Sequence, residues 1–162
     1  MSLYVAELDS ADALNCFSAN GAVERYRRED GDGGLIVSAT AIPNSGRAVE
    51  QLFAYGRYGT AGGPWVFHVA LRVPVDYRNE FLAWYETEHL QILLKAEHWG
   101  GCRFVEERVA DGLLFHVLHQ LDDLSALDSE QRKESRSTPW FKRLSRNEWF
   151  DTGFVRKTYR RV

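Results

Sequence analysis

Residues 65–73 read Trp-Val-Phe-His-Val-Ala-Leu-Arg-Val and lie between Gly62-Gly63-Pro64 and Pro74. β-branched and aromatic residues dominate this run, and such a run between Gly and Pro residues is typical of a β-strand. Every second residue from Trp65 onward is apolar, whereas the alternate residues include His68 and Arg72. The run therefore predicts a strand with one apolar face and one mixed face.

The apolar spacing changes after this strand. From Asp76 onward, aromatic and apolar residues and one histidine recur at steps of three and four, which is the spacing of one helix face. They are Phe81, Trp84, Tyr85, His89, Ile92 and Ala96. The pattern predicts a helix that runs to about Ala96, with Gly100-Gly101 as its stop signal.

The rest of the C-terminal part predicts three strands and a second helical stretch. The Asp111-Gly112 pair predicts a tight hairpin, and Pro139 is a break or restart within the helical stretch. The elements are strands at Cys102–Val109 and Leu113–Leu121, helix at about Leu124–Arg146, and a strand at Gly153–Arg161. The order β-α-β-β-α-β predicts an α+β, ferredoxin-like domain with an antiparallel sheet over residues 65–162.

The first 64 residues predict a partial repeat of this unit. Strands are expected at Leu3–Leu8 and Gly34–Ile42, a mostly helical stretch at Asp9–Glu29, and a strand or an arm at Gln51–Tyr58. The segments 8–14 and 121–127 match at four of seven positions, and each ends a strand and opens a helix. We interpret residues 1–64 as a β-α-β half-repeat, equivalent to the last half of the domain, plus a connection. Chance similarity at helix starts is the alternative.

Composition excludes several classes of protein. The 162 residues carry 20 Lys and Arg against 23 Asp and Glu, so no overall basic charge favours nucleic acid. The two cysteines, Cys16 and Cys102, show no CxxC spacing, which argues against a cysteine-built metal site and against a disulfide-dense secreted module. No signal peptide is visible, and no apolar run approaches the roughly 20 residues of a membrane helix. The expectation is a cytoplasmic protein without membrane or nucleic-acid partners.

Aromatic residues make up 13% of the chain, which suits a ring-packed core or a ring-lined pocket.

Four stretches carry a resemblance to a known family. Phe81-Leu-Ala-Trp84-Tyr85-Glu-Thr-Glu88-His89-Leu90-Gln-Ile-Leu93-Leu94, followed by Gly100-Gly101-Cys-Arg103-Phe104, resembles the dimeric α/β-barrel superfamily, most closely its EthD-type branch. The later Pro139-Trp140-Phe141 and Arg156–Arg160 are similar to the same relatives. The resemblance implies a homodimer in which two four-stranded sheets pair face to face to make a barrel, with the helices outside. The long N-terminal addition departs from this plan, and it could replace the partner sheet in part, cover one barrel mouth or extend the dimer contact. This superfamily hosts several unrelated activities.

Strand alternation sorts the candidate polar residues by face. Because the apolar parity of the strand at 65–73 suits helix packing, the mixed parity is expected to face the barrel interior. That face collects His68, Arg72, Arg103 and His116, whereas His119 has the opposite parity and is expected at the helix side or the surface. The two arginines could hold an anionic substrate oxygen, or pair with Glu107 or Glu80. A metal bound by His68 and His116 is not expected, because no third ligand is evident.

His89 is the leading candidate for a catalytic base. It lies on the apolar stripe of its helix, and a neutral imidazole there can accept a proton. The alternative is a half-buried histidine bonded to a backbone carbonyl or to Glu88. Trp84, Tyr85 and Tyr159 are expected to stand nearest to His89, although Trp84 and Tyr85 equally suit the core.

The leading functional hypothesis is a small, cofactor-independent enzyme acting on an aromatic or polyketide-like substrate in the barrel cavity. Proton transfer would drive cyclisation, isomerisation, decarboxylation or oxygenation, with His89 as base and Arg103 or His116 holding the substrate oxygen. Binding of a small aromatic ligand without catalysis, in an accessory dimer, is the second hypothesis. Haem binding through a histidine is the third.

Overall fold

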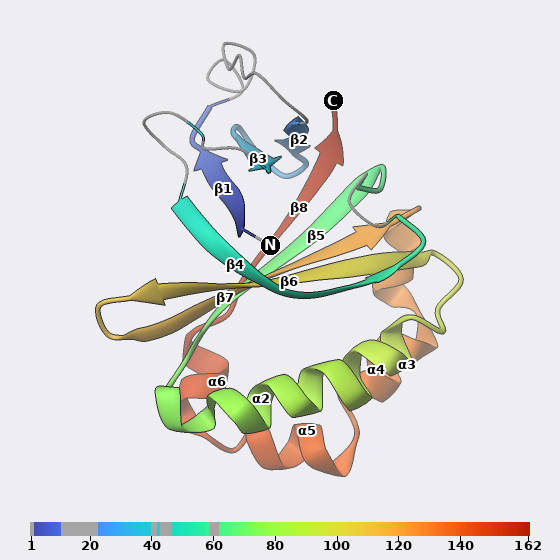
Figure 1. Ribbon diagram of the computed structural model, residues 1–162. Coiled ribbons are helices and arrows are strands. Elements are labelled where there is room, and N and C mark those ends of the chain that lie inside the picture. The colour runs from blue at the N-terminus through green and yellow to red at the C-terminus, as the bar shows by residue number, and fades with distance from the viewer. Residues whose placement is uncertain (1, 11–22, 40–41, 43–46, 59–61) are drawn as a thin grey trace.

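Eight antiparallel strands close into a barrel (Figure 1). The computed structural model describes residues 2–10, 23–39, 42, 47–58 and 62–162, and every element named below lies within these ranges. The order around the barrel is β1-β3-β2-β8-β5-β7-β6-β4, after which β4 pairs with β1. Closure leaves no free sheet edge among these strands.

The C-terminal half supplies one four-stranded sheet in the order β8-β5-β7-β6. Its strands are β5 (Trp65–Val73), β6 (Trp99–Val109), β7 (Gly112–Leu121) and β8 (Val155–Arg161). Gly112 adopts a φ of 138° at the predicted Asp111-Gly112 hairpin, a conformation that glycine adopts without a Cβ clash. Helical segments connect β5 to β6 and β7 to β8. The predicted α+β, ferredoxin-like order is confirmed.

The N-terminal half supplies a second four-stranded sheet, in the order β4-β1-β3-β2. Its strands are β1 (Ser2–Leu8), β2 (Val23–Arg28), β3 (Gly34–Ser38) and β4 (Arg47–Gly56). In both sheets the order is therefore fourth, first, third, second. The half-repeat hypothesis matched β1 with β7, the first strand of the last half of the domain. In the observed order, β1 instead has the same position in its sheet as β5 has in the other. Whether residues 1–64 and 65–162 fold as separate domains stays a prediction.

Residues 23–28, the last third of the helical stretch expected over residues 9–29, form a strand instead. Residues 11–22 lie outside the described ranges, and Val23–Arg28 is the strand β2. This strand pairs with β3 on one side and β8 on the other, and Tyr26 within it is fully buried. Pairing on both edges outweighs the weak local preference of a short basic segment.

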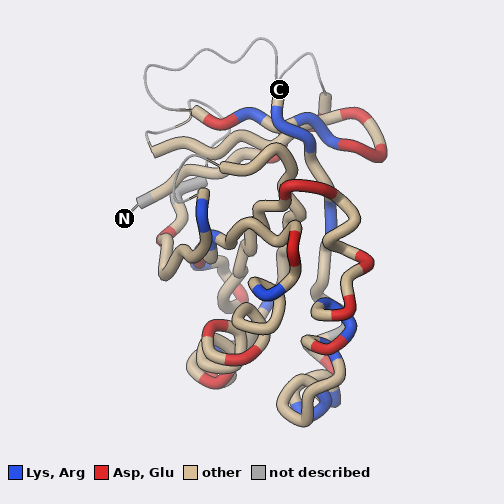
Figure 2. The backbone as a smooth tube through the Cα atoms, turned by 90° about the vertical axis from the view of Figure 1, so that its right-hand side faces the viewer, with Lys and Arg blue, Asp and Glu red and all other residues tan. Residues whose placement is uncertain are grey.

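The two sheets join within one chain. At one seam β2 pairs with β8, where Tyr26 lies opposite Arg161, and at the other β4 pairs with β6, where Gln51 lies opposite Val105. Figure 2 marks the basic residues of β2 and β8 beside each other near the C-terminus. The resemblance implied that a partner protomer supplies the second sheet. That expectation is corrected here, because the chain's own N-terminal half supplies it.

All the described helices cover the outer face of the C-terminal sheet (Figure 1). After β5 come η1 (Val75–Tyr77), α2 (Arg78–Trp84), the π-helical turn η2 (Tyr85–His89) and α3 (Leu90–Leu93). After β7 come η3 (Leu124–Asp128), α4 (Glu130–Ser135), α5 (Pro139–Leu144) and α6 (Glu148–Thr152). Pro139 restarts the helix as predicted, with the Thr138 side chain as its N-cap. None of these helices is long and apolar enough to cross a membrane.

Gly100 and Gly101, which were expected to stop the first helix, lie inside β6 instead, and the helix already ends at Leu93. A Cβ on Gly101 would lie 2.6 Å from the backbone oxygen of Tyr55 in β4. A Cβ on Gly100 would lie 2.3 Å from the ring of Tyr58. These glycines therefore allow the N-terminal segment to approach β6 closely.

Strand alternation divides the buried residues between two cores. The odd-numbered residues of β5, such as Phe67, pack under the helices together with Phe81 and Trp84. The apolar side chains of β6 and β7 that point to the same face of the sheet join this core. The opposite parity fills the barrel lumen, where Val66 and Leu118 meet residues of the N-terminal sheet such as Val5. The predicted division into a helix-facing and a lumen-facing set is confirmed.

Candidate functional site

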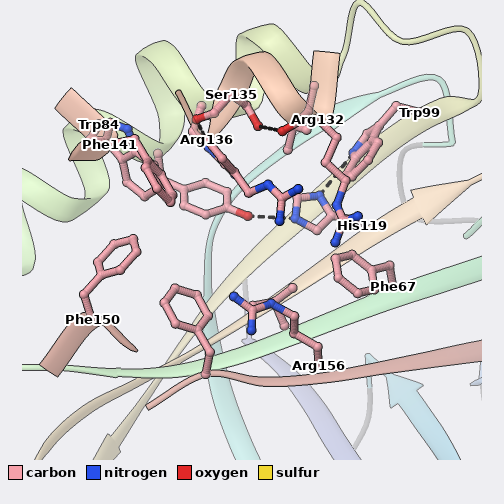
Figure 3. Close-up of a pocket in the computed structure, with 15 residues that line it drawn as sticks. Phe67, Trp84, Trp99, His119, Arg132, Ser135, Arg136, Phe141, Phe150 and Arg156 are labelled. Carbon is pink, nitrogen blue, oxygen red and sulfur yellow. Dashed lines mark hydrogen bonds between the residues drawn. The ribbon is translucent and has the colours of Figure 1, made fainter. Parts of the chain in front are cut away.

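A pocket lies between the helices and the outer face of the C-terminal sheet (Figure 3). Rings from both layers form most of its wall, and two histidines and three arginines interrupt them. The lining includes Phe67, Trp84, Tyr85, His89, Trp99, His119, Arg132, Arg136, Phe141, Phe150 and Arg156. The enclosed volume is about 70 Å³, roughly that of two water molecules. As it stands, the pocket admits part of a small molecule.

The π-helical turn η2 places two of these side chains. An extra residue in one turn re-aims the residues that follow it, and such turns often occur at functional sites. Here the turn begins at Tyr85, which is buried against the sheet, and ends at His89, which faces α4. The rings of Trp84 and Tyr85 lie 4.6 Å and 4.9 Å from the His89 ring, measured between centroids.

His89 has a defined tautomer. Its Nδ1 lies 3.2 Å from the backbone oxygen of Ser135, which can only accept, so Nδ1 carries the proton and donates. The lone pair is therefore on Nε2. Burial lowers the pKa of His89 to about 4, and the nearby Arg136 and Arg132 act in the same direction. At neutral pH the imidazole is uncharged and able to accept a hydrogen bond.

A second chain of hydrogen bonds crosses the pocket floor. Trp99 Nε1 donates to His119 Nδ1 over 3.2 Å, and His119 Nε2 lies 2.7 Å from the Tyr85 hydroxyl. Since an indole nitrogen only donates, Nδ1 is the acceptor and the His119 proton is on Nε2. The Tyr85 oxygen then accepts from His119, which leaves the tyrosine O–H proton available for another acceptor. Burial lowers the pKa of His119 and raises that of Tyr85, so both are neutral.

Three guanidinium groups surround this floor. Arg132 and Arg136 come from the α4 region and Arg156 from β8, and Figure 3 draws all three pointing into the pocket. Burial lowers the pKa of Arg132, and the like charges of Arg136 and Arg156 lower it further. Within the described ranges, no carboxylate forms an ion pair with any of the three. An anion would relieve this concentration of positive charge.

The barrel lumen holds a separate polar network. Arg103 is buried and makes two hydrogen bonds to the Glu24 carboxylate, of 2.7 Å and 2.6 Å. The sequence alternatives for its partner were Glu107 and Glu80, and the structure provides Glu24 from the other sheet. His68 and His116 also lie in the lumen, with His68 Nε2 3.0 Å from His116 Nδ1.

The predicted site residues therefore divide into two groups on opposite faces of the sheet. His89, Trp84 and Tyr85 line the helix-side pocket, whereas His116 and Arg103 lie in the lumen. The expectation that His89 acts with Arg103 or His116 on one substrate is wrong, because the C-terminal sheet separates them. Alternation along β6 and β7 sends adjacent residues to opposite faces.

Three further expected positions are described by the structure. His68 faces the lumen as predicted. Tyr159 does not approach His89. It is buried in the lumen, with its ring 6.3 Å from that of His68, because its parity in β8 directs it inward. Arg72 is exposed at the end of β5, with Nη1 3.6 Å from Asp111 Oδ2.

Sequence reasoning missed the role of His119 and the arginines as pocket residues. The parity of His119 matches that of Phe115 and Val117, which pack under the helices, so alternation placed it on the correct side. It is buried there and bonded to two aromatic side chains. The sequence did not indicate Arg132 as a pocket residue, because its segment resembles any solvent-exposed helix.

Comparisons with known proteins support the fold. No protein-family model matches the sequence, and no curated protein matches it. Solved structures do match, at low sequence identity. The structure of a major regulator of staphylococcal pathogenesis has a TM-score of 0.71 at 11% identity, over 100% of this chain and 99% of that one. This chain has a ferredoxin-like α/β-barrel fold.

Two further solved structures with this fold carry names that refer to enzymes. LmHde, a heme-degrading enzyme from Listeria monocytogenes, has a TM-score of 0.63 at 12% identity, over 99% of both chains. A ferredoxin-fold protein from Listeria monocytogenes, related to antibiotic biosynthesis monooxygenases, has a TM-score of 0.65 at 12% identity, over 99% of this chain and 94% of that one. Because the matches span nearly whole chains, the α/β barrel formed within one chain is a shared architecture.

Proposed function

We propose that the protein is an enzyme that acts on a small, planar, aromatic molecule with an anionic group, bound in the helix-side pocket. The observation that carries this proposal is the convergence of three guanidinium groups on a ring-lined pocket that also holds two neutral histidines. Ring walls suit a planar aromatic body, and guanidinium groups suit a carboxylate or a phenolate.

The same residues suggest how a substrate is held. Arg136 and Arg156 are exposed at the mouth of the pocket, whereas Arg132 is half-buried and donates to the backbone oxygen of Leu127 over 2.6 Å. Long, exposed side chains can move aside, so an entering ring enlarges the small cavity by displacing Arg136 and Arg156. The Tyr85 hydroxyl offers one neutral hydrogen bond to a substrate oxygen.

His89 is suited to accept a proton from the bound molecule. Nε2 carries the lone pair, and Nδ1–H is held by Ser135. A pKa of about 4 makes this imidazole a weak base, but an anion bound beside it raises that pKa, because a negative charge stabilises the imidazolium. In the proton transfer, a C–H or O–H bond of the substrate breaks, an N–H bond forms at Nε2, and the arginines stabilise the resulting anion.

The location of the chemistry is revised relative to the sequence hypothesis. We assign the cofactor-independent proton transfer to the helix-side pocket, because rings, histidines and arginines meet there. The enzyme names of two structural neighbours support small-molecule chemistry, and the regulator among them keeps ligand binding without catalysis as the alternative. A polyketide-like aromatic compound is one substrate of this kind, in line with the EthD-type resemblance.

Binding is tested by titrating the protein with substituted benzoates and phenols while following tryptophan fluorescence, because Trp84 and Trp99 line the pocket. We expect quenching by anionic aromatic compounds and none by their neutral esters and ethers. Arg132→Gln should weaken binding by about tenfold, the effect of roughly 1.4 kcal/mol. Arg72→Gln is the matched control, since Arg72 is exposed and outside this pocket. Equal losses in both variants would contradict the proposal.

Turnover separates the enzyme from a binding protein. Ligands that bind are incubated in aerobic deuterated buffer and followed by mass spectrometry for deuterium uptake and product formation. We expect His89→Gln to retain binding and to lose deuterium uptake. Binding with no exchange or product in the wild-type protein would favour the accessory, non-catalytic function.

Haem does not fit the pocket as it stands. The neutral His89 with its Nε2 lone pair is the form of histidine that ligates iron. The enclosed volume of about 70 Å³ is, however, far smaller than a porphyrin. We therefore assign no step to haem.

A further inference from the structure

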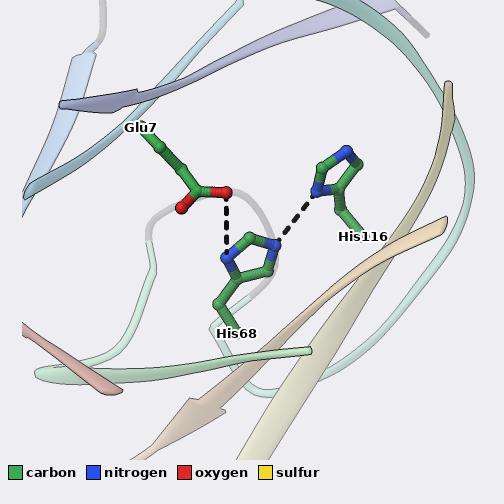
Figure 4. A group of neighbouring side chains, drawn as sticks. All are labelled: Glu7, His68 and His116. Atoms are coloured by element: carbon green, nitrogen blue, oxygen red, sulfur yellow. Dashed lines mark hydrogen bonds and ion pairs between the residues drawn. The ribbon is translucent and has the colours of Figure 1, made fainter. Parts of the chain in front are cut away.

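The barrel lumen contains a second cluster of chemically active side chains, separated from the helix-side pocket by the C-terminal sheet. His68 on β5 and His116 on β7 are diagonal neighbours, because His116 lies opposite Ala70 in the ladder. Glu7 reaches them from β1 in the other sheet (Figure 4). Both histidines are 1% exposed, whereas the Glu7 side chain is 24% exposed.

The nitrogen atoms of the two imidazoles face each other and two carboxylates. His116 Nε2 lies 3.0 Å from the Glu107 carboxylate, so Nε2 donates and the His116 lone pair is on Nδ1, facing His68 Nε2. His68 Nδ1 lies 3.9 Å from Glu7 Oε1. If His68 carries its proton on Nδ1, two lone pairs face each other over 3.0 Å. If it carries the proton on Nε2, a lone pair faces a carboxylate.

With the His68 proton on Nδ1, a cation bound by His68 Nε2 and His116 Nδ1 takes up the two facing lone pairs. We propose that Glu7, His68 and His116 form a binding site for a divalent transition-metal ion of the zinc class. One donor atom from each residue lies within 4.8 Å of the other two. Two nitrogens of a tetrahedral zinc site are about 3.3 Å apart, given bonds of about 2.0–2.1 Å. The observed 3.0 Å between the imidazole nitrogens is close to this separation.

The surrounding residues suit such a site. Glu107 on His116 Nε2 matches the carboxylate–histidine–metal arrangement that orients imidazole ligands. Lys157 donates to Glu7 Oε2, which leaves Oε1 on the side of His68. Two histidines and one carboxylate leave a fourth position for water.

The site also has a structural consequence and a route of entry. Glu7 belongs to the N-terminal sheet and both histidines belong to the C-terminal sheet, so a bound ion joins the two halves of the barrel. The partial exposure of Glu7 opens the cluster toward solvent at one side. Metal binding is therefore expected to stabilise the closed barrel, because the ligands are brought together only on folding.

The test uses the full, untagged chain, freed of metal by a chelator and titrated with Zn²⁺ by calorimetry and with Co²⁺ by visible absorption. We expect one equivalent per chain, a raised melting temperature, and the intense visible bands of four-coordinate Co²⁺. X-ray absorption of the zinc-loaded protein should count two imidazole ligands. A protein that binds no equivalent, or a bound zinc with fewer than two imidazoles, would overturn the proposal.

Variants assign the ligands. His68→Gln and Glu7→Gln should remove the stoichiometric binding, and Glu107→Gln should weaken it by about 10–100-fold, as expected for a residue that orients a ligand. His98→Gln is the control, because His98 lies outside the lumen beside Trp99. Circular dichroism checks that each variant is folded. If a variant is not folded, the number of imidazole ligands that X-ray absorption finds in the zinc-loaded wild-type protein tests the proposal. Binding unchanged in Glu7→Gln and His68→Gln would also overturn the proposal.

Discussion

His89 at the end of the π-helical turn donates from Nδ1 to the backbone oxygen of Ser135, 3.2 Å away at the end of α4. This bond joins the two helical segments that close the pocket. It also fixes the tautomer, so that the His89 lone pair is on Nε2. Burial and the two nearby arginines oppose protonation of this half-buried imidazole and outweigh the bond to Ser135, which favours the protonated ring.

Acid is therefore expected to destabilise the fold through His89. Its folded-state pKa of about 4 lies below the ordinary value near 6.5, so the unfolded chain binds more protons between these pH values. Stability from the neutral ring is complete above pH 6.5 and is lost as the pH falls toward 4. His119, whose pKa is also lowered, acts in the same direction. Urea unfolding at pH 6.5 and pH 5 should show that His89→Gln loses less stability than wild type, by on the order of 2 kcal/mol.

The control for this measurement is His98→Gln, which alters a histidine outside the pocket. It should lose as much stability as the wild-type protein between the two pH values. Parallel pH dependence of wild type and His89→Gln would show that His89 is not the neutral buried group inferred from its contacts.

The hydrogen bond between Tyr85 and His119 should contribute measurably to stability. Tyr85→Phe removes the acceptor of the His119 Nε2–H inside a buried site, which should cost about 1–3 kcal/mol. Tyr55→Phe is the matched control, because Tyr55 is exposed and its 2.6 Å bond to Glu86 lies in water. Its expected cost is below about 1 kcal/mol. Equal costs in urea unfolding would contradict the inferred tautomer and burial.

The ion pair between Arg103 and Glu24 links the two sheets through the lumen. Glu24→Gln leaves a buried guanidinium without its carboxylate and should cost about 3–5 kcal/mol. Glu130→Gln breaks the exposed pair with Lys133, whose expected cost is about 0–1 kcal/mol. Thermal unfolding of both variants measures the difference. A Glu24→Gln variant as stable as Glu130→Gln would mean that water reaches Arg103.

Periodicity predicted the C-terminal half of the fold because its signals are local. The alternation in residues 65–73 placed His68 in the lumen, and the helical stripe placed His89, Trp84 and Tyr85 together. The sequence could not predict that Glu7 would meet His68, since that contact depends on how the two sheets pair. Nor could it predict Tyr159 in the lumen, because the expectation followed ring content rather than the parity of β8.

Residues 65–162 alone should not remain a monomer. In the full chain, β2 covers the edge of β8 and β4 covers the edge of β6, and the N-terminal sheet covers Val66, Val105 and Leu118 in the lumen. The truncated chain exposes these edges and this apolar face, and open edges pair readily with another chain. Light scattering should find a dimer that rebuilds an eight-stranded barrel, or larger aggregates, against a control of the full chain. A folded, monomeric fragment would contradict the interdependence of the sheets and would support residues 65–162 as an independent domain.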